Sequence, residues 1–115
     1  MAFNDLDRKR IEMAMDAFLA KRRPPPHIRP DLDFGYRVTD HSVEILEIRP
    51  QWDDRSIIHE RAIAKATFVR TQGLWKVFWM RASLKWHGYD PAPTAASIDE
   101  FLSIVDTDQC GCFFG

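Results

Sequence analysis

The sequence predicts an α+β fold in which an N-terminal helix precedes an antiparallel meander of four to five strands, and a short C-terminal helix follows. Apolar residues recur at three- and four-residue spacing near both ends of the chain, at residues 4–23 and 97–105. Between residues 32 and 89 they form short extended segments separated by turn residues. Short connections favour a meander, and a long helix followed by four such strands is the element order of cystatin-like proteins. The 115 residues have the length of a single domain, 1–115.

The N-terminal helix is expected to begin at Asn4, whose side chain accepts a hydrogen bond from an early backbone N–H. Acidic residues in the first turn suit the positive end of a helix. The triple proline 24–26 ends the helix, because proline lacks an N–H and forces its predecessor out of the helical region. One stripe of the helix is apolar and comprises Ile11, Ala14, Met15, Phe18 and Leu19.

Residues 22–30, RRPPPHIRP, are expected to form a stiff, polyproline-like connector. One interpretation is a rigid spacer between helix and sheet. The other is an extended basic edge that meets phosphate or an acidic partner.

The first two strands are expected at Leu32–Val38 and Val43–Arg49. In the second strand the apolar residues change parity between Ile45 and Leu46, which predicts a β-bulge or burial of both faces. Residues 51–56, QWDDRS, are interpreted as a polar loop. A third strand follows at about Ile63–Arg70, and the turn at 71–73 leads into a fourth strand that starts near Leu74.

The fourth strand belongs to the segment LWKVFWMRASLKWHGY, residues 74–89, which holds three of the four tryptophans. Its two faces both carry large apolar groups: Trp75, Val77 and Trp79 on one, Phe78 and Met80 on the other. This pattern predicts a strand covered on both sides, since a half-exposed sheet has polar residues on one face. If both helices instead pack on one face, the other is an aromatic wall open to a ligand or a second subunit.

The C-terminal helix is predicted from a capping box at Ser97–Glu100. Its apolar stripe comprises Ile98, Phe101, Leu102 and Val105.

Charge is segregated along the chain although the net charge is only −1. Residues 61–89 contain six Lys or Arg and no acid, whereas residues 90–115 contain five acids and no Lys or Arg. Either the acidic segment folds back and pairs with the basic strands, or the basic segment attracts an anion.

Cations and aromatic rings together are typical of surfaces that stack bases and contact phosphates, although no base-reading motif is present. The leading hypothesis is therefore a non-enzymatic binding module for nucleic acid or an acidic protein. Its predicted surface comprises Arg22, Arg23, His27, Arg29, Arg81, Lys85, Trp86, His87 and Tyr89.

Two other classes of function stay open. A small metal-dependent hydrolase or nuclease would use Glu44, Glu47, His59 or His87, and a homodimeric structural protein would use the aromatic face as its seam. No metal site and no cofactor is predicted. Cys110-Gly111-Cys112 has no second ligand pair for a tetrahedral zinc, and phosphate-binding or dinucleotide-binding loops are absent from the sequence.

Several segments together resemble a small bacterial family known only as a domain of unknown function: KRRPPPHIR (21–29), LDFGYR (32–37), EIRPQW (47–52), AKATFV (64–69), WKVFWMRASLKWHGY (75–89) and CFFG (112–115). The resemblance implies a bacterial, stand-alone domain and transfers no catalytic residue. The N-terminus lacks the apolar region of a signal peptide, and no apolar run approaches the ~18 residues of a membrane helix. The expected location is the cytoplasm.

Overall fold

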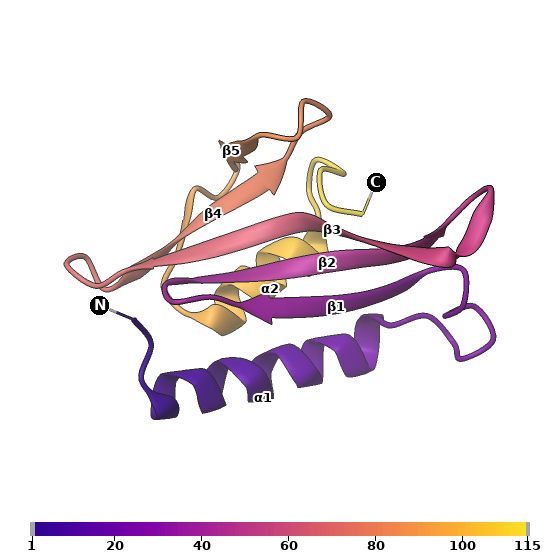
Figure 1. Ribbon diagram of the computed structural model, residues 1–115. Coiled ribbons are helices and arrows are strands. Elements are labelled where there is room, and N and C mark those ends of the chain that lie inside the picture. The colour runs from indigo at the N-terminus through magenta and orange to yellow at the C-terminus, as the bar shows by residue number, and fades with distance from the viewer. Residues whose placement is uncertain (1, 115) are drawn as a thin grey trace.

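A computed structural model describes residues 2–114, with two helices and six strands (Figure 1). The elements are, in chain order, α1 (Asp5–Arg22), β1 (Asp33–Val38), β2 (Ser42–Gln51), β3 (Asp54–Val69), β4 (Leu74–Met80), β5 (Trp86–Gly88), β6 (Thr94–Ala95) and α2 (Ile98–Thr107). All pairings are antiparallel and the order is β1-β2-β3-β4-β5, with β6 also paired to β4. The predicted α+β class and element order are confirmed. Within the described residues, no helix is long and apolar enough to span a membrane.

Both helices begin as their capping residues predict. The Asn4 side chain accepts from the Asp7 amide at 2.8 Å, and the Asp7 carboxylate accepts from the Asn4 amide at 3.2 Å. At α2, the Ser97 hydroxyl accepts from the Glu100 amide at 3.1 Å. These bonds satisfy N–H groups that have no partner within the helix.

The connector after α1 is not the extended polyproline segment that the sequence predicted. The Pro25 carbonyl accepts from the amides of Ile28 and Arg29, at 2.9 and 3.3 Å, and the Ile28 carbonyl accepts from Leu32 at 3.0 Å. Prolines remove donors but keep their carbonyls, so the amides that follow close a series of turns. The predicted extended basic edge is therefore wrong.

The predicted irregularity in β2 is a β-bulge. Ile45 lies opposite Ala64 and Leu46 lies opposite Ala62, so Ile63 is the extra residue on β3. Ile45 and Leu46 are both buried although they are consecutive. Because the extra residue lies on β3, β2 keeps its own alternation, and Ile45 and Leu46 are buried on opposite faces of the sheet.

The far part of β3 was missed by the sequence analysis. Gln51 pairs with Asp54, so the expected loop 51–56 is a tight turn, and β3 begins about nine residues before the predicted strand. Residues 54–61 are all exposed, because this part of the β2–β3 hairpin extends beyond the helices (Figure 1). Such a strand buries no face and shows no apolar alternation, which is the signal on which sequence prediction depends.

The main core cluster lies on one face of the sheet. Ile11 and Met15 of α1 and Phe101 and Val105 of α2 belong to one buried cluster with alternate residues of the central strands, namely Val43, Ile45, Ala64, Ala66, Trp75 and Val77. The helices contact each other, and α2 crosses behind β2 and β3 while α1 runs along β1 (Figure 1). The prediction that β4 is covered on both sides is wrong, because both helices pack on the same face.

Candidate functional site

The face of the sheet away from the helices carries cations and apolar side chains. We call it the open face and define it by residues of the last three strands of the meander: Lys65, Lys76, Phe78, Met80, Trp86 and Gly88. Strand alternation places them on one side, since Lys65 lies opposite Phe78, Phe78 opposite Gly88, and Met80 opposite Trp86. Phe78, Met80 and Trp86 are half-buried and lie outside the core cluster.

Lys65 is the centre of the open face. Its ammonium nitrogen lies 5.0 Å from the centroid of the Phe78 ring and 4.8 Å from that of Trp86. A cation near the face of an aromatic ring is attracted by the ring's negative π-face. Two rings from neighbouring strands therefore hold this charge in a defined place.

The charge of Lys65 is not neutralised by a carboxylate. Glu44 lies directly opposite Lys65 in the β2–β3 ladder, but its carboxylate binds Arg37, with an Nε–Oε1 distance of 3.3 Å. Among residues 2–114, Lys65 forms no ion pair. The rings position the ammonium group and leave its charge available.

The acidic C-terminal segment packs on the helix side of the basic strands, but its carboxylates do not pair with their cations. Asp106 binds Arg22 of α1, with an Nη1–Oδ1 distance of 3.3 Å. Asp108 accepts from the amides of Phe113 and Phe114, at 3.0 and 2.9 Å. In the described part of the chain, no ion pair joins a carboxylate of residues 90–108 to a cation of residues 61–89. Of the two interpretations of the charge segregation, pairing with the acidic segment is the one that the structure contradicts.

The predicted residues near β5 are divided between the two faces of the sheet. Trp86 belongs to the open face, whereas His87 lies opposite Trp79 on the helix side, with 6.3 Å between ring centroids. The Arg81 guanidinium also lies near Trp79, at 5.6 Å, and Lys85 is exposed in the loop before β5.

Tyr89 is not a surface residue. Its side chain is 1% exposed and packs against Phe113, and no side chain or backbone group of residues 2–114 forms a hydrogen bond with its hydroxyl. Burial raises the pKa of the Tyr89 phenol. Tyr89 belongs to the core, and its inclusion in the predicted surface is wrong.

The predicted basic residues that follow α1 form a separate group. Arg22 lies over the Phe114 ring at 3.9 Å as well as binding Asp106. Arg29 donates to the Pro24 carbonyl at 2.9 Å, and His27 is exposed in the turns. The Phe113–Phe114 segment lies between this group and β5, because Phe113 contacts Tyr89 and Phe114 contacts Arg22. The nine predicted residues do not form one continuous surface.

Arg23 anchors the end of α1 to β1. Its Nε and Nη2 donate to the two carboxylate oxygens of Asp33, at 2.8 and 2.6 Å. The hydrogen bond from Arg23 lowers the pKa of Asp33 below its ordinary value of 3.8. A carboxyl whose pKa is lower in the folded state stabilises the fold above its unfolded pKa, and this stabilisation is lost as the pH falls through the folded pKa.

Asp33→Asn is therefore expected to reduce the free energy of unfolding at neutral pH. Its difference from the natural protein should become smaller at acid pH, as the pH falls through the folded-state pKa of Asp33 and the carboxyl is protonated in the folded and the unfolded state alike. Urea unfolding at neutral and at acid pH measures this. A difference that is the same at both would show that the ion pair does not contribute. The exposed ion pair of Arg55 with Asp31 provides a control, and Asp31→Asn should have less effect.

The residues proposed for a metal-dependent hydrolase do not form one cluster. Glu47 and His59 line a groove of about 340 Å³ on the β2–β3 hairpin, but Glu44 lies on the other side of the sheet. The Glu47 carboxylate binds Arg49 at 2.8 Å, and His59 Nε2 bonds with Gln51 at 3.0 Å. Within residues 2–114, no three His, Cys, Asp or Glu side chains are grouped as metal ligands. Both cysteines are free, and burial raises the pKa of the Cys112 thiol.

Lys65 and Phe78 were the functional candidates that sequence reasoning missed. Lys65 was noted only as one of six cations, and Phe78 was assigned to the core. The distance between them in sequence hides their contact, which follows from the register of the β3–β4 hairpin. Counting back from the predicted turn at 71–73 would pair Arg70 with Leu74 and place Lys65 opposite Trp79. The observed register pairs Val69 with Leu74, because Arg70 also belongs to the turn.

The family model described as "Domain of unknown function (DUF3024)" matches residues 3–115. The chain belongs to this family. The match confirms the family resemblance drawn from the sequence motifs. No curated protein and no solved structure matches this DUF3024 chain. The family description transfers no activity or ligand to it.

Proposed function

We propose that this DUF3024 protein is a non-enzymatic binding module that holds single-stranded nucleic acid on the open face of its sheet. The observation that carries the proposal is the Lys65 ammonium group, which lies over the rings of Phe78 and Trp86 and pairs with no carboxylate of residues 2–114. Rings that accept bases and a cation beside them that accepts phosphate are the two parts that sequence-tolerant strand binding needs.

The geometry of β5 favours a flat ligand. Gly88 lies opposite Phe78 and carries no side chain, and a Cβ added there would meet nothing within 4 Å. The open face is therefore vacant beside Phe78, on the side away from Lys65. A base seated there would contact the Phe78 ring and leave its phosphate near Lys65 or the exposed Lys76.

Trp86→Ala is expected to weaken the binding of a fluorescein-labelled oligothymidylate about tenfold, because base–aromatic stacking contributes roughly 1–3 kcal/mol per base. Fluorescence anisotropy measures the affinity at several salt concentrations. Affinity should fall steeply as salt rises, since phosphate neutralisation releases counterions. Lys65→Gln should weaken binding and also reduce the slope of log affinity against log salt by about 0.7.

Trp52→Ala is the matched control, because Trp52 is 92% exposed but lies at the tip of the β2–β3 hairpin, away from the open face. Equal losses in the Trp86 and Trp52 variants would contradict the proposal, as would no binding by the natural protein at low salt. Light scattering tests the competing hypothesis that the open face is a dimer interface. If the natural protein is a dimer and Trp86→Ala converts it to a monomer, the open face is a subunit interface.

A further inference from the structure

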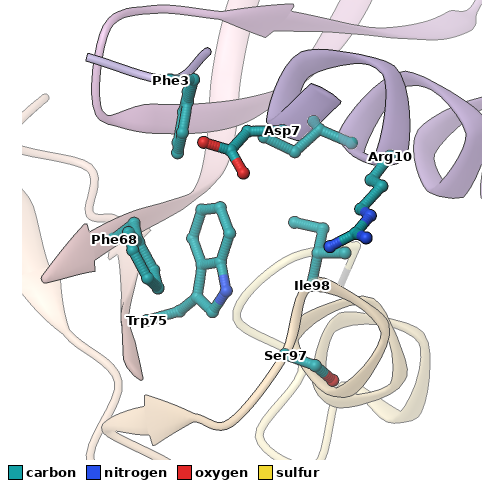
Figure 2. A pocket seen from close by; sticks show the side chains of 8 residues that line it. Phe3, Asp7, Arg10, Phe68, Trp75, Ser97 and Ile98 are labelled. Atoms are coloured by element: carbon teal, nitrogen blue, oxygen red, sulfur yellow. The ribbon is translucent and has the colours of Figure 1, made fainter. Parts of the chain in front are cut away.

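The first turns of α1 and α2 and the β3–β4 hairpin enclose a pocket on the helix side of the sheet, and Figure 2 shows its lining. Its volume is about 200 Å³. The lining residues are Phe3, Asp7, Arg10, Ile11, Phe68, Trp75, Ser97 and Ile98. The pocket shares no residue with the open face, although Trp75 and Phe78 belong to the same strand.

The walls of the pocket are mainly apolar and aromatic. Trp75 stands between two phenylalanines, with centroid distances of 5.6 Å to Phe3 and 5.1 Å to Phe68. Ile98 faces Trp75 across the pocket (Figure 2). Such walls favour a ligand with a flat apolar body.

The buried indole of Trp75 presents an unused donor to this pocket. Trp75 is 7% exposed, and in the described chain no acceptor takes its N–H. Figure 2 shows the indole nitrogen turned toward Ser97 and Ile98, with the six-membered ring toward Asp7. The N–H itself is accessible to solvent, since in the described residues the Tyr89 hydroxyl is the fully buried side-chain polar group without a partner. A ligand acceptor in the pocket could therefore take the Trp75 N–H in place of water.

Two further groups favour a negative acceptor. Arg10 reaches over the pocket beside Ile98 (Figure 2), and among residues 2–114 its guanidinium forms no ion pair. The Ser97 hydroxyl accepts from the Glu100 amide and can still donate its own proton. Ser97 also marks the positive end of the α2 dipole.

The carboxylates near the pocket do not oppose an anion at its Ser97 end. Asp7 already accepts from Arg70, with an Nη2–Oδ2 distance of 3.2 Å, and lies beside the opposite end of the indole (Figure 2). Asp99 and Glu100 in the first turn of α2 line other hollows of the surface. Arg10 therefore provides the charge nearest to a ligand bound between Trp75 and Ile98.

We propose that this pocket binds a small carboxylate with a planar apolar body. The apolar part would lie between the aromatic walls, and the carboxylate would accept from the Trp75 N–H and Arg10, near the positive end of the α2 dipole. A cavity of roughly 150 Å³ holds one benzene ring, so this pocket has room for a single ring and a carboxylate. Phenylacetate has this size and chemistry.

The test is a titration of the ¹⁵N-labelled protein with phenylacetate, followed through the indole N–H resonance of Trp75. Trp75→Phe assigns that resonance by deleting it. Phenylacetate is expected to shift it with a Kd of about 1 mM, which suits a ligand of this size. Arg10→Gln should weaken binding about tenfold, because a charge-assisted hydrogen bond is lost. Lys9→Gln, a neighbouring exposed cation of α1 that does not line the pocket, should leave Kd unchanged.

Phenylacetamide, which keeps the ring but not the charge, should bind about tenfold more weakly than phenylacetate. Equal affinities for the two compounds would overturn the carboxylate assignment, and an indole resonance that does not move would overturn the site. Trp86→Ala should not change phenylacetate affinity. The outcome is therefore independent of nucleic-acid binding by the open face.

Discussion

Phe101→Ala is expected to lower the free energy of unfolding by about 3–5 kcal/mol, whereas Phe78→Ala should lower it by only about 1 kcal/mol. Phe101 is 0% exposed and lies in the core cluster that α2 shares with the sheet. Its truncation leaves a cavity that the surrounding helices and strands cannot fill completely. Phe78 is half-buried on the face without a helix, so water fills most of the space that its ring leaves.

Urea unfolding of the two variants measures this contrast between identical substitutions on opposite faces of the sheet. The comparison tests whether the sheet is covered on one side only, on which the proposed nucleic-acid interface depends. Similar losses from both variants would indicate that another element or a second subunit buries Phe78. Repeating the measurement at several protein concentrations separates these cases, because the stability of a dimer depends on concentration.

Local features of the fold were predicted correctly because neighbouring residues determine them. The caps at Asn4 and Ser97 and the end of α1 before Pro24 each follow from hydrogen bonds or steric contacts within a few residues. The parity change at Ile45 and Leu46 similarly indicated burial of both faces of β2, since consecutive residues of a strand point to opposite faces.

The coverage of the sheet could not be predicted in the same way. Phe78 and Met80 are apolar, and their apolar character alone does not distinguish a buried face from a recognition surface. The choice depends on where α2 packs, which is set by contacts between distant parts of the chain. The partners of the acidic residues after position 90 could not be predicted for the same reason. Asp106 binds Arg22, which is 84 positions away in the sequence.

The candidate site was predicted only in part for a related reason. The predicted surface combined residues that are adjacent in the chain, such as Trp86, His87 and Tyr89. Neighbours in an extended segment point to opposite faces, so Trp86 lies on the open face, whereas His87 lies on the helix side and Tyr89 in the core. The cation that does lie beside Trp86 is Lys65, which comes from another strand.

Gly88 offers a way to change the charge of the open face without disturbing the fold. A Cβ added at Gly88 would meet no atom within 4 Å, and Gly88 does not have a positive φ, so a larger residue fits its place in β5. Both substitutions place a side chain where the base is proposed to sit, so the effect of charge is measured between the two variants. Gly88→Lys is expected to bind oligothymidylate about 25-fold more tightly than Gly88→Glu, since each of the two charge changes corresponds to about 1 kcal/mol at an exposed position.

The roughly 25-fold difference between the two variants should shrink as salt is added, because exposed charges are screened over about 10 Å at 0.1 M ionic strength. Anisotropy titrations at low and high salt measure it, and urea unfolding verifies that both variants are folded. Gly73→Lys and Gly73→Glu are unsuitable controls, since Gly73 has φ +63° and any side chain there is strained. Thr71 in the same turn is exposed and unstrained, so Thr71→Lys and Thr71→Glu provide the matched pair. If the Thr71 pair differs as much as the Gly88 pair, the oligonucleotide responds to net charge alone and the open face is not its binding site.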